Sequence, residues 1–410
     1  MWLYAITMQK AGLCIENNHL TSYNKHYKKF ACEMAGEMME QQKILYCAST
    51  ASHLINFHLP YMQGLQEMGY SITACVNESC EISFADEVKV IPFHKQIASM
   101  KNIKNIFRVY QLLKQEQYKA ISVHTTLAGA VVRAAVRLLP KEKRPKVFYT
   151  CHGYLFNNDD GISKWKYLLP EKICAKVTDV LMVMNAQDKD LAEHYKLYNQ
   201  KTGKLISIPG MGVNFSRFDM PQTKAELRTE YGISEDEVLY IFAGEFSHRK
   251  NQKMLINAFA QAASDIPHAK LILAGEGTLL DDCKQLVQSL NLENQIYFPG
   301  HVRNMPVLYR MGDVCVSASK IEGLPFNIME AMYCQLPCVV SDIKGHQDLI
   351  DDGQTGFLCS DELSFCQCIV TLYHNERMRI LLGQSAKVNA ERYRLKHVGK
   401  VILDVYETNL

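Results

Sequence analysis

Residues 313–342 decide the fold, and they read DVCVSASKIEGLPFNIMEAMYCQLPCVVSD. A strand pattern, DVCVSAS, leads into the turn KIEGLP, and a short apolar helix and a second β-branched run, PCVVSD, follow. Pro325 suits the first turn of that helix, where its missing N–H would have no partner. This order predicts one βα unit of a doubly wound parallel sheet.

Two carboxylates, Glu322 and Glu330, flank the start of the predicted helix, eight residues apart. Ligands of such sheets bind beyond the carboxyl ends of the strands, and a helix N-terminus favours an anion such as phosphate. Gly323 would let the backbone approach a ligand closely. A carboxylate is also a good acceptor for a ribose diol. The two acids could therefore contact opposite ends of an extended ligand; the alternative is two solvated surface acids.

The same alternation of strands and helices runs through most of the chain. Before a Gly- and Pro-containing break at 207–218, the strand patterns are 43–50, 71–76, 119–125, 146–152 and 179–185, with helical patterns at 54–68, 102–117, 127–138, 164–177 and 187–195. After the break the strand patterns are 238–245, 269–277, 294–300, 313–319 and 337–342, with helical patterns at 251–263, 279–290, 304–311 and 326–335. We expect two Rossmann-like domains, 43–206 and 207–382, facing across a cleft. A helical segment, 383–410, would pack back toward the first domain.

Composition excludes several classes of protein. The chain has 410 residues, 48% hydrophobic and 21% charged, which is typical of a globular protein of two domains. No apolar run reaches the roughly 18–20 residues of a transmembrane helix, and the first residues do not form a signal-peptide pattern. Residues 1–42 are a poorly patterned extension, and one interpretation is that the natural chain starts at Met39. The 14 cysteines are scattered without metal-site spacing, as expected for buried thiols in a reducing cytosol.

Charge is distributed unequally between the two halves. Residues 41–205 carry 22 Lys and Arg against 14 Asp and Glu, a net of +8, whereas residues 206–380 carry 14 against 22, a net of −8. Such halves either attract each other or have different partners. The basic residues of 95–146 could form a helical face that binds anionic lipid, or a simple solvated face. They are Lys95, Lys101, Lys104, Arg108, Lys114, Lys119, Arg133, Arg137, Lys141, Lys143, Arg144 and Lys146.

A second basic element follows the first strand of the second half, in AGEFSHRKNQKMLINAF, residues 243–259. The strand pattern ends at Gly244, and a short loop carries Arg249 and Lys250 before a helix. Cations at the carboxyl edge of a parallel sheet suit a diphosphate. The alternative is a solvent-exposed basic loop.

Three histidines follow strands of the first half. His152 closes a strand in FYTCHGYLF, 148–156, and His124 ends the preceding strand in the same way. His53 and Asn56 follow the first strand and could reach the same cleft, although Ser52 could instead cap a helix there. Asp188-Lys189-Asp190 has the Asp-x-Asp spacing of some metal sites, but it lies in a helical pattern and is expected to be a solvated face. No metal site is expected.

These motifs resemble the family 4 retaining glycosyltransferases of the GT-B fold, and within them the bacterial exopolysaccharide and capsule enzymes. The Glu-x7-Glu stretch carries the resemblance, which extends over about residues 43–400. Further shared segments are SHLINFHLPY (52–61), YTCHGYLF (149–156) and GEF (244–246) followed by Lys-Asn-Gln. The chain departs from the family at Glu245, where many members have arginine, at Ser49–His53, where many have a Gly-Gly loop, and at Gln335, where glycine is usual.

The resemblance implies a role for each residue. Glu330 would hold the ribose of a UDP-sugar and Lys250 its diphosphate, with Arg249 as a substitute for the arginine missing at 245. Glu322 and His152 would be catalytic, beside the donor sugar. The remaining nucleotide-sugar contacts would be Gly244, Gly323, Leu324 and Pro325.

The resemblance also implies an activity. The enzyme would transfer a sugar, with retention of configuration, to a polyprenyl-diphosphate-linked saccharide in surface-glycan synthesis, at the cytoplasmic face of the cell membrane. It would need no metal and no cofactor besides the nucleotide-sugar. No nucleic-acid-binding module is recognisable. The alternatives are a sugar-nucleotide epimerase of the same fold and a non-catalytic protein that binds nucleotide-sugars.

Overall fold

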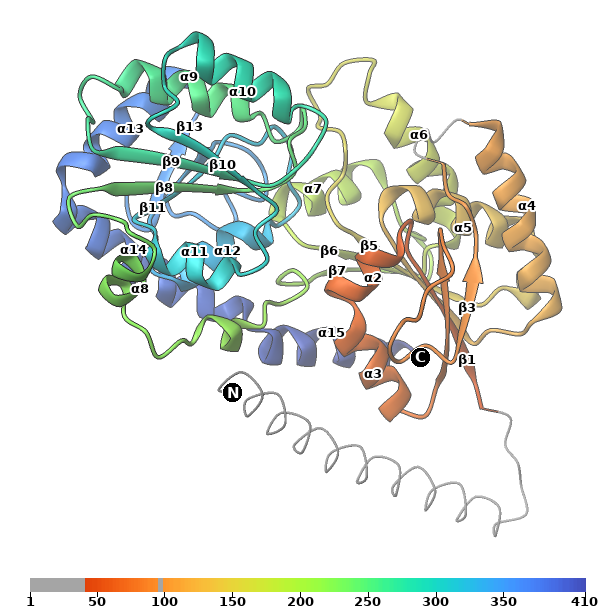
Figure 1. The fold of residues 1–410 in the computed structure, drawn as a ribbon. Helices are drawn as coiled ribbons and strands as arrows, with labels where there is room; N and C mark the ends of the chain where they lie inside the picture. The colour runs from red at the N-terminus through yellow and green to blue at the C-terminus, as the bar shows by residue number, and fades with distance from the viewer. Residues whose placement is uncertain (1–40, 95–98) are drawn as a thin grey trace. The chain divides into compact units, whose positions relative to one another are not determined.

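The computed structural model describes residues 41–94 and 99–410, which form two parallel sheets covered by helices (Figure 1). Residues 1–40 of the predicted N-terminal extension lie outside the described residues, and so does Lys95 of the predicted basic face.

The first sheet has seven strands in the order β3-β2-β1-β4-β5-β6-β7, and every neighbouring pair is parallel. Its central strands are buried on both faces, which is why they read as nearly continuous apolar runs in the sequence. The strands are β1 (Lys43–Cys47), β2 (Ser71–Val76), β3 (Glu87–Val90), β4 (Ala120–His124), β5 (Lys146–Cys151), β6 (Val180–Val183) and β7 (Lys204–Ser207).

Two groups of helices cover the first sheet. On one face α2 (Ala51–Phe57), α3 (Leu59–Glu67) and the C-terminal α15 (Leu395–Asn409) share a core with Ile44 and Tyr46 of β1. On the other face lies a second core that contains Leu45 of the same strand. The helices of that face are α4 (Met100–Gln115), α5 (Thr126–Leu138), α6 (Trp165–Cys174) and α7 (Ala186–Tyr195).

The second sheet has six strands in the order β10-β9-β8-β11-β12-β13, again all parallel. The strands are β8 (Val238–Ala243), β9 (Ala269–Ala274), β10 (Ile296–Gly300), β11 (Val314–Ser317), β12 (Cys338–Ser341) and β13 (Gly356–Cys359). The helices of this half are α8 (Lys224–Glu230), α9 (Gln252–Ala262), α10 (Leu280–Ser289), α11 (Met305–Met311), α12 (Phe326–Tyr333), α13 (Glu362–His374) and α14 (Glu376–Ala390). Short 3-10 turns occur at Lys141–Lys143, Ala175–Val177, Phe215–Phe218 and Glu391–Tyr393.

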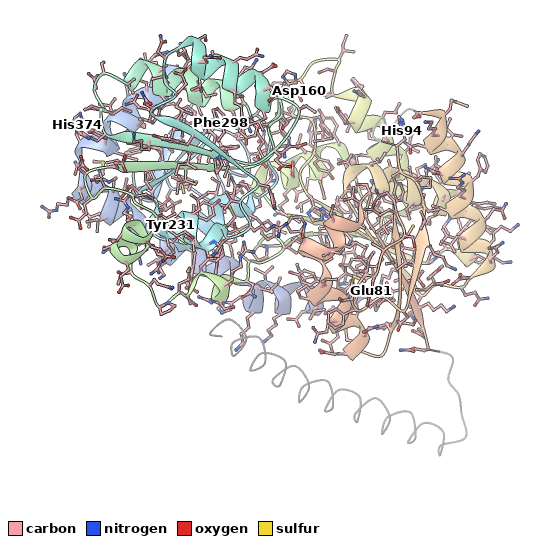
Figure 2. All side chains as sticks on the ribbon, viewed as in Figure 1. Glu81, His94, Asp160, Tyr231, Phe298 and His374 are labelled. Atoms are coloured by element: carbon pink, nitrogen blue, oxygen red, sulfur yellow. The ribbon has the colours of Figure 1, made fainter. Side chains whose placement is uncertain are left out.

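The predicted α/β class with two parallel sheets is confirmed. Buried side chains of the two sheets form cores with their helices, and Phe298 of β10, labelled in Figure 2, packs against the core of the second sheet. The sequence analysis missed β3, β7 and β13, and the helices α8 and α13. Both β3 and β7 are four-residue edge strands without a buried residue, so they carry no apolar pattern. Within the described ranges, no helix combines the length and the apolarity that crossing a membrane requires.

Lys344, in the loop after β12, joins the loops of the two sheets. Its Nζ donates to the carbonyl oxygens of Tyr154 (2.7 Å) and Phe156 (3.1 Å) and to Oδ1 of Asp188 (2.9 Å). The ion pair is buried on both sides. The prediction that Asp188 belongs to a solvated face is therefore wrong, because this carboxylate receives an ammonium group from the other half of the chain; Asp190 is exposed as expected.

Two glycines meet where the loops of the two sheets touch. Gly153 follows His152 and has φ of +116°, a conformation that L side chains rarely adopt. A Cβ on Gly323 would lie 2.0 Å from the carbonyl oxygen of His152, and one on Gly153 would lie 2.8 Å from Cα of Gly323. The expectation for Gly323 was a close approach to a ligand. The structure shows a close approach to the backbone of the first domain.

Arg133 corrects the predicted basic face. It is fully buried in α5, where Nη2 donates to Oε2 of Glu171 (2.7 Å) and Nη1 to Oγ1 of Thr178 (3.2 Å). Its guanidinium lies 3.7 Å from the ring centre of Tyr149. Arg133 is thus a core residue whose charge is paired, and it cannot contribute to a surface.

We expect Arg133→Met to lower the free energy of unfolding by about 3–5 kcal/mol, because Glu171 would remain as a buried, unpaired charge. Arg137→Met, one turn later on the exposed face of α5, is the matched control and should change it by less than about 0.5 kcal/mol. Urea unfolding followed by circular dichroism measures both. Equal midpoints for the two variants would contradict a structural role for the buried pair.

Candidate functional site

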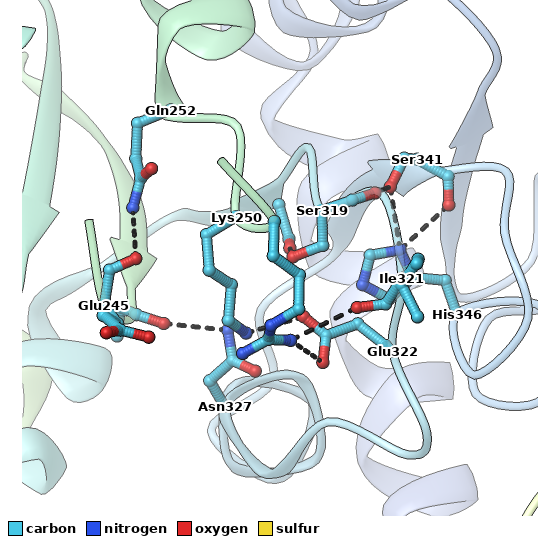
Figure 3. A network of polar contacts seen from close by, with 12 residues as sticks. Glu245, Lys250, Gln252, Ser319, Ile321, Glu322, Asn327, Ser341 and His346 are labelled. Atoms are coloured by element: carbon cyan, nitrogen blue, oxygen red, sulfur yellow. Dashed lines mark hydrogen bonds and ion pairs between the residues drawn. The ribbon is translucent and has the colours of Figure 1, made fainter. Parts of the chain in front are cut away.

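The loop between β11 and α12 carries Glu322, whose carboxylate is bound on both oxygens (Figure 3). Lys250 donates to Oε1 at 2.6 Å, and Arg249 donates from Nη1 to Oε2 at 2.9 Å. Arg249 also donates to the carbonyl oxygen of Ile321 at 3.2 Å. The two predicted constellations, the acidic turn and the basic loop, therefore meet at one place.

Charge pairing decides the protonation state of Glu322. Burial alone would raise its pKa, but Lys250 and then Arg249 outweigh burial and lower the pKa to about 2. The carboxylate is ionised at every physiological pH. In this structure it offsets one of the two positive charges of the basic loop, so the three side chains together carry a net charge of +1.

Glu330, in the helix that follows this loop, has an environment that shifts its pKa in the opposite direction. Burial raises its pKa to about 7, and the neighbouring Arg217 only partly opposes this effect. Arg217, from the 3-10 turn Phe215–Phe218, donates from Nη2 to Oε1 of Glu330 at 2.6 Å. The arginine side chain is 52% exposed, whereas that of Glu330 is 13% exposed. A half-exposed arginine thus covers a nearly buried carboxylate whose pKa lies close to neutrality.

Local structure holds α12 in place. The helix begins at Phe326, as the pattern 326–335 predicts, and Pro325 is its N-cap rather than a residue of its first turn, with extended backbone at φ −76° and ψ 124°. Asn327 donates from Nδ2 to the carbonyl oxygen of Ala243 at 3.0 Å, which ties α12 to the end of β8. Gly244 follows that residue directly, so the loop that carries Lys250 starts beside the helix N-terminus. Leu324 is buried next to Gly210 of the interdomain linker.

The histidines of the first domain form one cluster. His53 Nε2 lies 3.4 Å from His152 Nε2, and the rings of His124 and His152 have centroids 5.7 Å apart. His58, to which the sequence analysis gave no role, completes the group, with its ring centroid 3.9 Å from that of His124. A possible signal was the break between α2 and α3, where His58 precedes Leu59-Pro60 and turns inward.

Burial gives all four imidazoles the same charge state. It lowers the pKa of His53 to about 4, and it lowers the pKa of His58, His124 and His152 well below the usual value, helped by repulsion from neighbouring histidines. The cluster is neutral at pH 7. Its nitrogens can accept hydrogen bonds or ligate a metal, but they do not supply positive charge.

Other residues that the sequence analysis singled out lie outside the histidine cluster or have a different role. Asn56 is exposed on α2 rather than grouped with the histidines. Thr50, not Ser52, caps α2, because its side chain accepts from the N–H of His53 at 3.3 Å. Gln335 has φ of +62°, the left-handed conformation that glycine adopts most easily, which explains why glycine would be usual there.

The arrangement fits an extended anionic ligand. Two cations and a helix start lie at the carboxyl end of β8 and β11, where a diphosphate would be stabilised. Glu330, a nearly buried carboxylate inside α12, can accept hydrogen bonds from two adjacent hydroxyl groups of a ligand. The neutral histidines lie beside the loop between β11 and α12, because the backbone of His152 contacts Gly323 of that loop.

Two family models match this chain. Residues 43–184 match "Glycosyl transferase 4-like" and residues 223–387 match "Glycosyl transferases group 1". The putative glycosyltransferase EpsD of Bacillus subtilis is 30% identical over 370 residues, which cover 89% of this chain and 96% of that protein. An Escherichia coli protein named UDP-Gal:alpha-D-GlcNAc-diphosphoundecaprenol alpha-1,3-galactosyltransferase is 29% identical over 298 residues, 70% of this chain and 74% of that protein.

A solved structure confirms the predicted fold. HepE from Anabaena, in complex with UDP and glucose, superposes with a TM-score of 0.71 over 90% of this chain and 100% of that chain. The sequence identity is 18%, so the likeness shows the GT-B arrangement of two Rossmann-like domains and nothing finer.

We expect Lys250→Met to weaken UDP binding about tenfold or more, because a charge-assisted hydrogen bond contributes about 1.5–3 kcal/mol. Glu322→Gln should leave UDP affinity within about threefold, since it removes a negative charge beside the diphosphate and UDP carries no donor sugar for Glu322 to contact. Isothermal titration measures both variants.

Lys253→Met, on the exposed face of α9, is the matched control and should bind UDP as the unmodified chain does. If Glu322→Gln lost as much affinity as Lys250→Met, Glu322 would be a nucleotide contact rather than a support for the two cations.

Proposed function

The chain belongs to family 4 of the glycosyltransferases, and from this premise we propose that it transfers a sugar from a UDP-sugar to a hydroxyl of a lipid-linked saccharide. The observation that carries the proposal is the joining of Lys250 and Arg249 to Glu322 at the start of α12, with Glu330 inside the helix. The name of the Escherichia coli relative supports a role in surface-glycan synthesis, since that protein is named for UDP-galactose and a diphosphoundecaprenol-linked acceptor.

In the proposed complex, the diphosphate lies against Lys250 and Arg249, and its negative charge draws these cations away from Glu322. Glu330 accepts hydrogen bonds from the ribose, for which Arg217 must first move aside. Arg217 is half exposed, so this movement breaks its ion pair with Glu330 and its contact with the ring of Phe218 without unfolding the turn that carries it. Glu322 is then free to contact the donor sugar, the role that the resemblance implies.

The proposed chemistry needs no resident cofactor, because the nucleotide itself carries the sugar. Lys250 and Arg249 stabilise the departing diphosphate as its charge develops. The leaving phosphate would take the proton from the acceptor hydroxyl on the same face of the sugar, which gives retention. A glycosidase mechanism would require two carboxyl groups about 5–10 Å apart around one sugar carbon. Glu322 is ionised and paired with two cations, so it is unsuited to act as a general acid.

We also propose that the first domain binds the anionic inner face of the cell membrane through α4 and α6. These helices lie on the same side of the first sheet, with α5 between them (Figure 1). On α4, Met100, Ile103 and Phe107 are exposed at a spacing that puts them on one face.

The second helix repeats this pattern. Trp165, Leu169 and Ile173 of α6 are 47%, 51% and 46% exposed, and Ile162 in the preceding loop is 90% exposed. That loop also carries Asp160, labelled in Figure 2. Exposed lysines flank both apolar stripes, as in helices that lie in a membrane interface. They are Lys101 and Lys104 on α4, and Lys166 and Lys172 on α6.

A basic groove continues the surface beyond the end of α6. It has a volume of about 1190 Å³ and lies at the amino edge of the first sheet. Asp179 is the acidic residue among its lining side chains, so the groove suits anionic lipid headgroups. The lining Lys and Arg are Arg137, Lys141, Arg144, Lys146, Lys172, Lys176, Lys196 and Lys201.

The activity is tested by incubating purified protein with labelled UDP-sugars and polyprenyl-diphosphate-linked saccharides. A new glycoside whose anomeric configuration matches the donor, identified by NMR, supports the proposal. An epimerised donor without glycoside would indicate an epimerase. Binding of a UDP-sugar without release of UDP, across acceptors, would indicate a binding protein.

We expect UDP-glucose affinity to rise with pH through about 7, because burial raises the pKa of Glu330 to about 7 and only the ionised carboxylate accepts from both ribose hydroxyls. UDP-glucose is suitable because its diphosphate is esterified at both ends and does not titrate near neutrality. Titrations from pH 5.5 to 8.5 measure the affinity.

Glu330→Gln should bind UDP-glucose weakly at every pH, without the rise, and should lose turnover while remaining folded. The same rise in Glu330→Gln, or an unchanged affinity for UDP, would exclude Glu330 as the ribose ligand.

For the membrane face, we expect sedimentation with vesicles that contain anionic phosphatidylglycerol and little with neutral phosphatidylcholine vesicles. The double variant Trp165→Ser/Leu169→Ser should lose most of the binding, since it removes the apolar surface that enters the interface. Leu363→Ser, an exposed leucine of α13, is the matched control. Equal binding to neutral vesicles, or no loss in the double variant, would contradict the proposal.

A further inference from the structure

We propose that His53, His58 and His152 form a binding site for a divalent transition metal ion of the zinc class. Their three candidate ligand nitrogens all lie within 4.8 Å of one another. The residues come from the carboxyl edge of the first sheet, His53 and His58 from the segment after β1 and His152 from the end of β5. The sequence analysis expected no metal, because it found no cluster of Cys and His with zinc spacing and because the resemblance implies chemistry without a metal.

The distance between the first two nitrogens matches tetrahedral coordination. Two nitrogens bound at about 2.0–2.1 Å with a tetrahedral angle between them lie about 3.4 Å apart. His53 Nε2 and His152 Nε2 are 3.4 Å apart, with their rings nearly perpendicular at 84°. A hydrogen bond between the two imidazoles would also give this distance, so the third histidine decides between the two interpretations.

His58 has the features of a ligand prepared for a metal. It is fully buried, and its Nε2 has no hydrogen-bond partner among the described residues. Its Nδ1 lies 3.0 Å from the hydroxyl of Tyr46, which can accept from Nδ1–H and so leave the lone pair of Nε2 free. A hydrogen bond on the far nitrogen is the usual support of a metal-bound histidine. A buried nitrogen without a partner is costly, and a metal ion would satisfy it.

The surroundings select the kind of ion. No carboxylate belongs to the cluster, and neutral imidazoles suit Zn²⁺, Co²⁺, Ni²⁺ and Cu²⁺ rather than Mg²⁺ or Ca²⁺. His124 packs beside His58 and donates to or accepts from Ser122, as a wall of the site rather than a ligand.

Three protein ligands leave a fourth position for water or for a ligand hydroxyl. The carbonyl of His152 touches Gly323, so the ion would lie beside the loop of Glu322, where the proposed function puts the donor sugar. The metal site itself does not depend on that function, because its test measures bound metal and not transfer. The proposed ion is distinct from the positive charge on the diphosphate, which Lys250 and Arg249 supply.

The full chain, without a histidine tag and stripped with a chelator, is dialysed against Zn²⁺ and analysed for bound metal, and titrated with Co²⁺ in the visible region. We expect one equivalent of Zn²⁺ per chain and the intense d–d bands of four-coordinate Co²⁺. His53→Gln, at a half-buried position, and His58→Phe should each weaken Zn²⁺ binding at least about tenfold.

His301→Gln, at an exposed position of the second domain, is the matched control and should bind as the unmodified chain does. Circular dichroism shows whether His58→Phe folds, and His53→Gln decides the question if it does not. Absence of the Co²⁺ bands at one equivalent would overturn the proposal. So would equal Zn²⁺ binding by His53→Gln and His301→Gln, which would indicate adventitious surface sites.

Discussion

The buried ammonium of Lys344 is the interaction on which the geometry of the site depends. Its three N–H groups are all used, on two carbonyls of the 154–156 segment and on Asp188, and the pair is almost fully buried. A buried charge with every donor satisfied tolerates no displacement, because any movement would leave a charge unpaired. The segment that it holds follows His152 directly, so the histidine stays against Gly323 and beside Glu322.

The two glutamates show how environment rather than sequence assigns chemistry. Both belong to one strand–turn–helix unit, yet Lys250 and Arg249 lower the pKa of Glu322 to about 2, while burial raises that of Glu330 to about 7. Glu322 is therefore a fixed negative charge that orders two cations, and in the proposed complex the diphosphate competes for them. Glu330 is a carboxylate whose only ion-pair partner, among the described residues, is the half-exposed Arg217. The site is thus organised before a ligand arrives, and only side chains need to move.

The sequence was sufficient where the physical signal was local. Continuous β-branched runs identified the buried strands, and the Glu-x7-Glu unit located the loop where Glu322 and Lys250 meet. Prediction from the sequence failed where a residue's partner lies far along the chain. Spacing could not show that Lys344 enters the surroundings of Asp188, 156 residues away, or that Gly323 is small because it packs on His152. His58 was missed for the same reason, since its role follows from a turn between α2 and α3 and from β5, not from its neighbours in sequence.

The distribution of charge implies that the two domains attract their ligands in different ways. Residues 206–380 have a net charge of −8, the same sign as a nucleotide diphosphate, so the net charge of this segment does not attract such a ligand. In the proposed complex, its affinity comes from short contacts with Lys250, Arg249 and the start of α12. The first half has a net charge of +8, with exposed apolar stripes on α4 and α6 and a basic groove beyond them. In the proposed membrane binding, long-range attraction would act on that half, whereas the histidines at the carboxyl edge of its sheet are neutral.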